Sequence, residues 1–220
     1  MADLAIITAI TDGYDTLKPV LPQTGLDVEW ICFTDGEPLP DADASAGWTM
    51  VCESRHGRHA NREAKRPKLR PWEYTSAPAS IWVDASFRVV SDRFAVEALA
   101  YADPIAQFVH PWRDCLYEEA ATSALLPKYR SEPVIEQART YRARGHPEHW
   151  GLWAAGVIVR RHTREVRALG EAWAAEVNAW SFQDQVSQPY VLRTVGLRPA
   201  PLPGTHLANG WLKYEGSGRH

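Results

Sequence analysis

The sequence has few cysteines, no long apolar run and no strong excess of either charge. Its three cysteines, Cys32, Cys52 and Cys115, are an odd number without metal-ligand spacing, which favours reduced thiols in a cytosolic protein. No apolar run approaches the ~20 residues that cross a bilayer. The first residues contain neither a basic leader nor a small-residue cleavage site. We therefore expect a cytoplasmic protein with no signal peptide and no membrane span.

Several motifs of nucleotide-binding proteins and hydrolases are also missing. The sequence contains no P-loop, no Gly-x-Gly-x-x-Gly, no Gly-x-Ser-x-Gly and no His-Glu-x-x-His. A nucleotide would therefore be bound by residues at strand ends rather than by a glycine-rich cradle. The formal charge of -3 gives no support for a protein that grips a nucleic-acid backbone.

The pattern that is present is an alternation of apolar strands and amphipathic helices. A length of 220 residues fits one domain. Strands are predicted over residues 4–10, 28–33, 48–52, 80–83, 104–109 and 155–159. Helices are predicted from residue 114, over 131–145 with Ser131 as cap and Gly145 as stop, and over 166–177. This order predicts an α/β fold with a central, mostly parallel sheet flanked by helices. The segment from 199 to 220 is expected to lack regular structure.

Polar residues follow the predicted strands, where ligands bind in open α/β sheets. The most informative is Asp84, which ends an otherwise apolar strand. A carboxylate in this position needs compensation of its charge. A divalent cation shared with a diphosphate would supply it, because Mg²⁺ and Mn²⁺ prefer oxygen ligands and bridge phosphates. The alternative is that Asp84 caps the following turn.

Five short segments occur in an order that resembles a known family. They are TAITDGYD at 8–15, ICFTD at 31–35, SIWVD at 80–84, HPWRDCLYEE at 110–119 and DQ at 184–185. Each is weak alone, but together they resemble DUF616, a family placed among GT-A-like glycosyltransferases, with plant members similar to pectin galacturonosyltransferases. The resemblance covers roughly residues 4–190. It implies a GT-A (Rossmann-like) fold, similar to retaining family 8 glycosyltransferases, and a nucleotide-sugar donor, for which we expect UDP.

The resemblance also implies roles for individual residues. The first strand and the turn after it would hold the nucleoside, through Thr8, Thr11, Gly13 and Tyr14. The end of the second strand would recognise the base, through Asp35. The metal-binding Asp-x-Asp motif of GT-A enzymes would fall on Asp84 and Ser86, so a serine replaces the second carboxylate. The expected cofactor is Mn²⁺ or Mg²⁺.

Two basic features add to this prediction. Residues 206–213, HLANGWLK, resemble the His-x-x-Gly-x-x-Lys motif of family 8 with one extra residue. By that resemblance His206 would bind the metal and Lys213 the diphosphate; the alternative is a surface histidine and lysine in a mobile tail.

The densest basic stretch of the chain contains Arg58, Arg62, Lys65 and Lys68. Arg62 and Lys65 would face the donor phosphates if the segment is helical, until Pro67 interrupts it. The alternative is a solvated basic face.

Residues near the reacting sugar come from the second half of the chain. By resemblance, Asp184 and Gln185 would approach the reacting face of the sugar, although Asp184 could equally cap a helix. His110, Arg113 and Gly156 are candidates for acceptor binding. The favourable helix dipole accounts for Glu118 and Glu119 without any chemistry.

These observations predict a single glycosyltransferase domain, retaining and metal-assisted. The nucleotide-binding half would span about 1–110, the acceptor-binding half about 111–198, and a tail 199–220. One alternative is a metal-dependent hydrolase of amides or esters, with ligands among His59, His110, His146, His149 and His206. Another is a non-catalytic carbohydrate-binding module, suggested by the ten tryptophans. The acceptor stays open between saccharide, lipid, protein, small molecule and modified nucleic acid.

Overall fold

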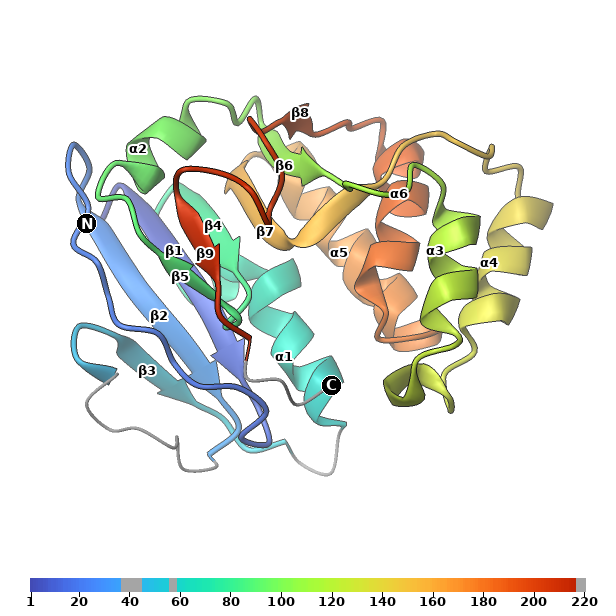
Figure 1. Cartoon of the computed structure of the whole chain (residues 1–220), viewed down its shortest axis with the longest axis horizontal. Coiled ribbons are helices and arrows are strands. Elements are labelled where there is room, and N and C mark those ends of the chain that lie inside the picture. The colour runs from blue at the N-terminus through green and yellow to red at the C-terminus, as the bar shows by residue number, and fades with distance from the viewer. Residues whose placement is uncertain (37–44, 56–58, 217–220) are drawn as a thin grey trace.

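A mostly parallel sheet forms the centre of the molecule (Figure 1). The structure, a computed structural model, describes residues 1–36, 45–55 and 59–216. The strand order is β3-β2-β1-β4-β7-β6-β8. The strands are β1 Leu4–Ile10, β2 Val28–Thr34, β3 Thr49–Cys52, β4 Ala79–Val83, β6 Ile105–Val109, β7 Trp153–Arg161 and β8 Ala200–Pro201. β7 runs antiparallel to both β4 and β6, whereas the other neighbouring pairs are parallel. The predicted α/β class and mixed, mostly parallel sheet are therefore confirmed.

Alternate residues of the strands build two apolar layers, as the two-residue repeat of a strand requires. Ile6 and Ile81 face one layer, together with Phe94 of helix α2 (Phe94–Leu99). Ile7 and Trp82 face the other, which is covered by α1 (Ala60–Leu69), α5 (Arg164–Ala179) and α6 (Asp184–Val195). Because both faces are covered, the carboxyl ends of β1 and β4 are the places where these strands can present polar groups.

The helices confirm most predicted positions and correct two details. α4 (Val134–Ala143) ends just before Gly145, whose φ of 77° closes the helix as predicted. Its N-cap is Pro133, so the predicted capping by Ser131 is wrong. Pro67 lies inside α1 instead of ending it, because the last turn of the helix continues to Leu69. Two further helical segments are α3 (Leu116–Ser123) and the 3₁₀ turn η3 (Pro127–Tyr129); another 3₁₀ turn, η2 (Pro71–Glu73), follows α1.

The described part of the C-terminal segment, up to residue 216, contains two short strands, which corrects the prediction that residues 199–220 lack regular structure. β8 adds to β6 at the edge of the main sheet. β9 (Leu212–Tyr214) pairs with β5 (Phe87–Val89) as a separate antiparallel ribbon. Sequence composition missed both because the pairing is supplied by the exposed edges of strands distant in the sequence. This ribbon places the segment before β9 close to the end of β4.

Helices α3, α4, α5 and α6 gather at the opposite end of the molecule from β3 (Figure 1). Helices α3, α4 and α6 share a third apolar cluster, built around Leu116, Tyr141, Phe182 and Val186, whereas α5 packs in the layer of Ile7 and Trp82. Within the described ranges, no helix is long and apolar enough to span a bilayer.

Candidate functional site

A cleft of about 230 Å³ opens at the carboxyl ends of β1 and β4. Its walls come from the turn after β1, the first half of α1, the turn between β4 and β5, η3 and the segment before α6. The residues that line it are Ala9, Ile10, Thr11, Tyr14, Asp15, Asn61, Ala64, Lys65, Trp82, Asp84, Ala85, Ser86, Lys128, Tyr129 and Phe182. Of the predicted site residues, the cleft brings together Thr11, Tyr14, Lys65, Asp84 and Ser86.

Asp84 faces this cleft from the residue after β4, and 41% of its side chain is exposed. Trp82 Nε1 donates a hydrogen bond to Asp84 Oδ1 at 2.6 Å. The Lys68 ammonium lies 3.7 Å from the same oxygen. An indole N–H and a buried ammonium thus compensate the carboxylate from behind, which lowers the cost of placing it at the end of an apolar strand.

Asp184 is a buried carboxylate behind the cleft wall. It is the first residue of α6, whose N-cap is Gln183, so the predicted capping role of Asp184 is wrong. Its two oxygens lie 2.9 Å from Lys65 Nζ and 2.6 Å from Lys68 Nζ. Burial raises the pKa of Asp184, but the two lysines outweigh it and hold this pKa at about 2. Asp184 therefore anchors both lysines, of which Lys65 lines the cleft.

A third cation lies beneath this pair. Arg160 of β7 is fully buried and donates to the carbonyl of Lys68 and to Ser80 Oγ. Burial lowers its pKa to about 9, so the guanidinium stays charged at neutral pH. With Lys65 and Lys68, the floor carries three cations, against the carboxylates of Asp84 and Asp184. This excess favours an anionic ligand above it.

The turn after β1 is held in a left-handed conformation by Asp35. Asp12 and Gly13 both have a φ of 58°, a region that glycine tolerates and aspartate enters at a cost. Asp35 Oδ2 accepts the N–H of Asp12 at 2.9 Å and lies 3.1 Å from Arg55 Nε. The Asp35 side chain is buried, so its observed role is to shape the turn that presents Tyr14 to the cleft.

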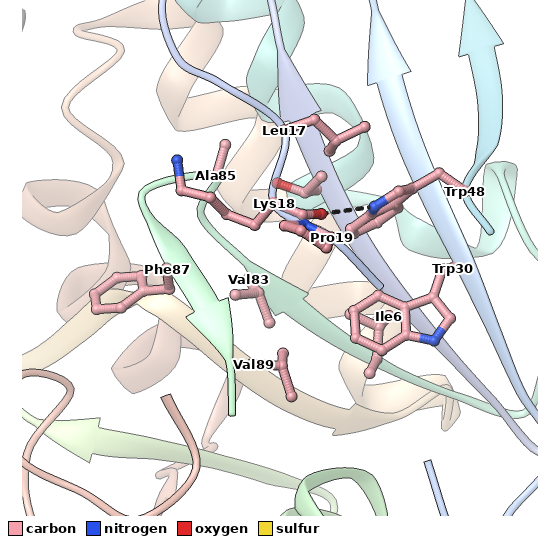
Figure 2. A pocket seen from close by; sticks show the side chains of 11 residues that line it. Ile6, Leu17, Lys18, Pro19, Trp30, Trp48, Val83, Ala85, Phe87 and Val89 are labelled. Carbon is pink, nitrogen blue, oxygen red and sulfur yellow. Dashed lines mark hydrogen bonds between the residues drawn. The ribbon is translucent and has the colours of Figure 1, made fainter. Parts of the chain in front are cut away.

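Thr8 lies at a different place from the other predicted nucleotide contacts. It lines a separate apolar cavity of about 20 Å³, on the sheet face covered by β5 (Figure 2). Trp30 and Trp48 form one side of this cavity, and Trp48 Nε1 donates to the carbonyl of Lys18 at 2.9 Å. A volume this small accommodates little more than one water molecule. A contact of Thr8 with a nucleoside stays a prediction.

Two predicted phosphate contacts, Arg62 and Lys213, do not line the cleft. The Arg62 guanidinium lies 2.8 Å from Glu132 and donates to the carbonyls of Val177 and Trp180. Lys213 has an exposed side chain that lies 3.3 Å from Glu215. Arg58 falls outside the described residues. Within the basic stretch, Lys65 lines the cleft and Lys68 lies beneath it. Phosphate binding by Arg62 and by Lys213 stays a prediction.

His206 lies near Asp84 but outside the cleft lining. Its ring packs edge-on against Phe87 and Trp112, with centroids 6.0 and 6.4 Å apart. Burial lowers the pKa of His206 against the opposing charge of Asp84, which leaves a neutral imidazole at pH 7. Its buried Nδ1 has no hydrogen-bond partner among the described residues. The described ranges contain no group of three or more His, Cys, Asp or Glu side chains arranged to hold a metal.

Of the predicted acceptor residues, Gly156 of β7 contacts Asp84, whereas His110 and Arg113 follow β6, one strand further along the sheet. Gly156 leaves room for its neighbours because it has no side chain. A Cβ at this position would lie 3.1 Å from Asp84 Oδ2 and 3.1 Å from Phe87 Cε2. Its carbonyl accepts the Asp84 N–H at 2.8 Å. His110 follows β6, and its Nδ1 accepts the N–H of Arg113 at 3.0 Å. Gly156 therefore provides the space that the Asp84 carboxylate occupies.

Sequence reasoning missed the importance of Glu119. Its buried carboxylate accepts the Arg113 Nε hydrogen bond at 2.7 Å and the Gln185 Nε2 bond at 2.9 Å. Gln185 itself lies outside the cleft lining and accepts the N–H of Ala155 at 3.0 Å. The sequence did contain a signal for this pairing, because Arg113 precedes the first-turn glutamate Glu119 by six residues. The helix dipole alone does not explain that arginine.

The tryptophans and histidines were the basis of the two alternative functions. Trp112, 67% exposed, is the tryptophan that faces solvent, whereas the other nine are buried or partly buried. The tryptophans therefore serve mainly the core. The histidines considered for a hydrolase form no three-ligand group within the described part of the chain.

The comparisons with known proteins identify a glycosyltransferase-like family and fold. A family model described as "TOD1/MUCI70, glycosyltransferase-like domain" matches residues 45–201. Among solved structures, the chain is similar to the apo structure of the WbbM bifunctional glycosyltransferase, with 10% identity and a TM-score of 0.54. The match covers 92% of this chain and 39% of that one, so it spans well under half of the WbbM chain and shows the fold alone. No curated protein matches the sequence.

Proposed function

Because the chain belongs to the TOD1/MUCI70 glycosyltransferase-like family, the DUF616 family that the sequence resembles, we propose that it transfers a sugar from a nucleotide-sugar donor, with UDP as the nucleotide. The observation that carries the proposal is the Asp84 carboxylate, which faces a strand-end cleft whose wall contains Lys65. The donor would occupy the cleft, with its diphosphate beside these two residues.

The cleft offers complementary surfaces for the two parts of such a donor. Tyr14 and Thr11 lie at the end of β1, where a nucleoside would stack and bind. Lys65 and the cationic floor would neutralise the leaving diphosphate, and interactions that strengthen as charge develops contribute most to the rate. Lys128 of η3 also lines the cleft, with Nζ 5.0 Å from the centroid of the Tyr129 ring.

A divalent cation fits this site only together with the diphosphate. The protein offers one cleft-facing carboxylate at Asp84, the hydroxyl of Ser86 and, nearby, the neutral imidazole of His206 with its unpartnered Nδ1. Mg²⁺ is usually held by one or two carboxylates, waters and substrate phosphates. Asp84 and Ser86 would hold Mn²⁺ or Mg²⁺ from the cleft side and His206 from beside it. The bound cation would polarise the phosphate oxygens of the leaving group.

The acceptor would approach from the half of the chain that follows residue 110. Gly156 lies next to Asp84, and His110 and Arg113 follow β6, one strand further along the sheet. Gln185 would stand near the reacting sugar, whereas the contacts of Asp184 support a role in holding Lys65. We infer retention of the anomeric configuration from the family; an inverted anomeric proton in the product's NMR spectrum would refute it.

The donor can be tested by thermal-shift measurements with UDP, GDP, CDP and ADP sugars, with and without Mn²⁺. A ligand at about 100 times its Kd stabilises by about 2.7 kcal/mol, which raises the Tm of a domain of this size by roughly 5–10 °C. We expect UDP sugars to give this shift and Asp84→Asn to remove most of it.

Asp92→Asn is the matched control, because Asp92 is an exposed aspartate outside the cleft lining. The proposal fails if no nucleotide sugar shifts the Tm, or if Asp84→Asn and Asp92→Asn behave alike.

A further inference from the structure

A buried carboxylate connects both walls of the site. Glu119 is 4% exposed and belongs to the first turn of α3. Its Oε2 lies 2.7 Å from Nε and 2.6 Å from Nη2 of Arg113, so two N–H groups of the guanidinium converge on one carboxylate oxygen. This ion pair places Glu119 against the segment that carries His110.

The second oxygen of Glu119 binds the amides of two glutamines. Oε1 accepts Nε2 of Gln185 at 2.9 Å and Nε2 of Gln183 at 3.2 Å. Ser123 Oγ lies 3.4 Å away and also accepts Nε2 of Gln183, at 2.8 Å. Because an ionised carboxylate only accepts hydrogen bonds, it selects the NH₂ end of each amide.

The opposite ends of these amides reach the two walls of the cleft region. Gln185 Oε1 accepts the N–H of Ala155, the residue before Gly156, whose carbonyl in turn binds Asp84 N–H. Gln183 Oε1 accepts the hydroxyl of Tyr129, which lines the cleft. If either amide rotated by half a turn, its oxygen would face Glu119 Oε1, acceptor against acceptor, and the NH₂ group of Gln185 would also face the Ala155 N–H, donor against donor.

We propose that Glu119 is a positioning residue for glycosyl transfer: it sets which way the Gln185 and Gln183 amides face, and through them the geometry beside Asp84 and at Tyr129. The inference rests on the proposed function. The neighbouring Glu118 occupies the same helical turn, yet its side chain makes no hydrogen bond that the described residues show. The helix dipole is shared by both glutamates, so the dipole does not account for the network.

The first experiment compares Glu119→Gln with the matched control Glu118→Gln. In Glu119→Gln, an NH₂ group must face either Arg113 or the two glutamine amides, which places donor against donor. We expect kcat to fall by about 10–100-fold, since small displacements of a reacting group cost up to about 10² in rate. The donor KM should change by less than about threefold, and Glu118→Gln should match the wild type within about twofold.

A double-mutant cycle separates positioning from general destabilisation. When Gln185→Ala is already present, adding Glu119→Gln should lower kcat by less than about threefold. The reason is that the effects of residues that act through one another are not additive. The proposal would be overturned if the decrease in kcat of the double variant equalled the product of the two single decreases. It would also be overturned if Glu119→Gln lowered the Tm and left kcat unchanged.

A second measurement does not depend on turnover. The side-chain amide resonances of Gln183 and Gln185 in ¹H–¹⁵N NMR spectra should shift and lose protection from exchange in Glu119→Gln but not in Glu118→Gln. If the wild type neither binds nor turns over any nucleotide sugar, the proposed function fails while these resonances still test the positioning. Unchanged resonances in Glu119→Gln would overturn it.

Discussion

The two sides of the site differ in how their polar groups are used. At the ends of β1 and β4, Tyr14, Lys65 and Asp84 present polar atoms to an open cleft. On the side of α3 and α6, Glu119 and Gln183 are buried and bind one another. Polar groups that are enclosed by the protein can position others, whereas polar groups that also line the cleft can contact a ligand.

The largest expected effect comes from Asp184, which lies between these two regions. Asp184→Asn would leave Lys68 buried with the more distant Asp84 as its carboxylate partner. Removing one partner of a buried ion pair costs about 3–5 kcal/mol. We expect a loss of that size in the free energy of unfolding, measured by urea denaturation at pH 7, with Asp92→Asn close to the wild type. A loss below about 1 kcal/mol would show that the pair is not a structural anchor.

The same pair has a defined pH dependence. The pKa of Asp184 is about 2 in the folded protein and about 3.9 in an unfolded chain. Because the folded-state pKa is depressed, the stabilisation is complete above about pH 5 and is lost as the pH falls from there towards 2. The difference in unfolding free energy between the wild type and Asp184→Asn should therefore be constant from pH 5 to 7 and shrink below pH 4.

Gly156→Ala tests whether the open side depends on the space around Asp84. The added Cβ would lie 3.1 Å from Asp84 Oδ2, so the carboxylate has to move. We expect kcat to fall about tenfold, which corresponds to about 1.4 kcal/mol of transition-state stabilisation. Gly210→Ala is the control, because a Cβ there meets nothing within 4 Å. Equal kcat values for the two variants would contradict the assigned position of Asp84.

His146 provides a smaller effect on the buried side. Burial lowers its pKa to about 4, with the charge of Arg193 acting in the same direction. The folded state thus favours the neutral ring, and stability should decline as the pH falls from about 6.5 to 4. After allowance for solvent screening we expect about 1 kcal/mol. His146→Gln should flatten this part of the stability curve; an unchanged slope would exclude His146 as the titrating group.

The smallest expected effect is that of Lys128, a lysine that lines the cleft and lies over the Tyr129 ring. Lys128→Met should raise the donor KM about threefold and leave kcat unchanged, because a solvent-screened charge contributes less than about 1 kcal/mol. Arg93→Met, at an exposed cation outside the cleft, should have no effect. A kcat change in Lys128→Met would place this lysine nearer the reacting atoms.

The sequence predicted the sheet and the strand-end position of Asp84 because both depend on local apolar patterns. Ile7 and Trp82 belong to runs that are apolar at nearly every position, which is the signature of strands covered on both faces. The family motif at 8–15 then identified Tyr14, and the basic stretch identified Lys65; both line the cleft.

The direction of long side chains could not be predicted in the same way. Arg62 and Lys65 lie three residues apart on α1, yet one binds Glu132 and the other Asp184. Their partners are about 70 and 119 residues away in the sequence. The sequence also did not indicate that Arg160, at the end of an apolar run, is buried beneath the cleft. Such contacts depend on packing between distant elements, which neither periodicity nor spacing records.

The most direct test is a crystal structure of the protein with UDP and Mn²⁺. The account predicts the diphosphate in the cleft between Lys65 and the end of β4, with the Asp84 carboxylate turned towards it. A nucleotide bound on another surface, with Asp84 still held only by Trp82 and Lys68, would contradict it.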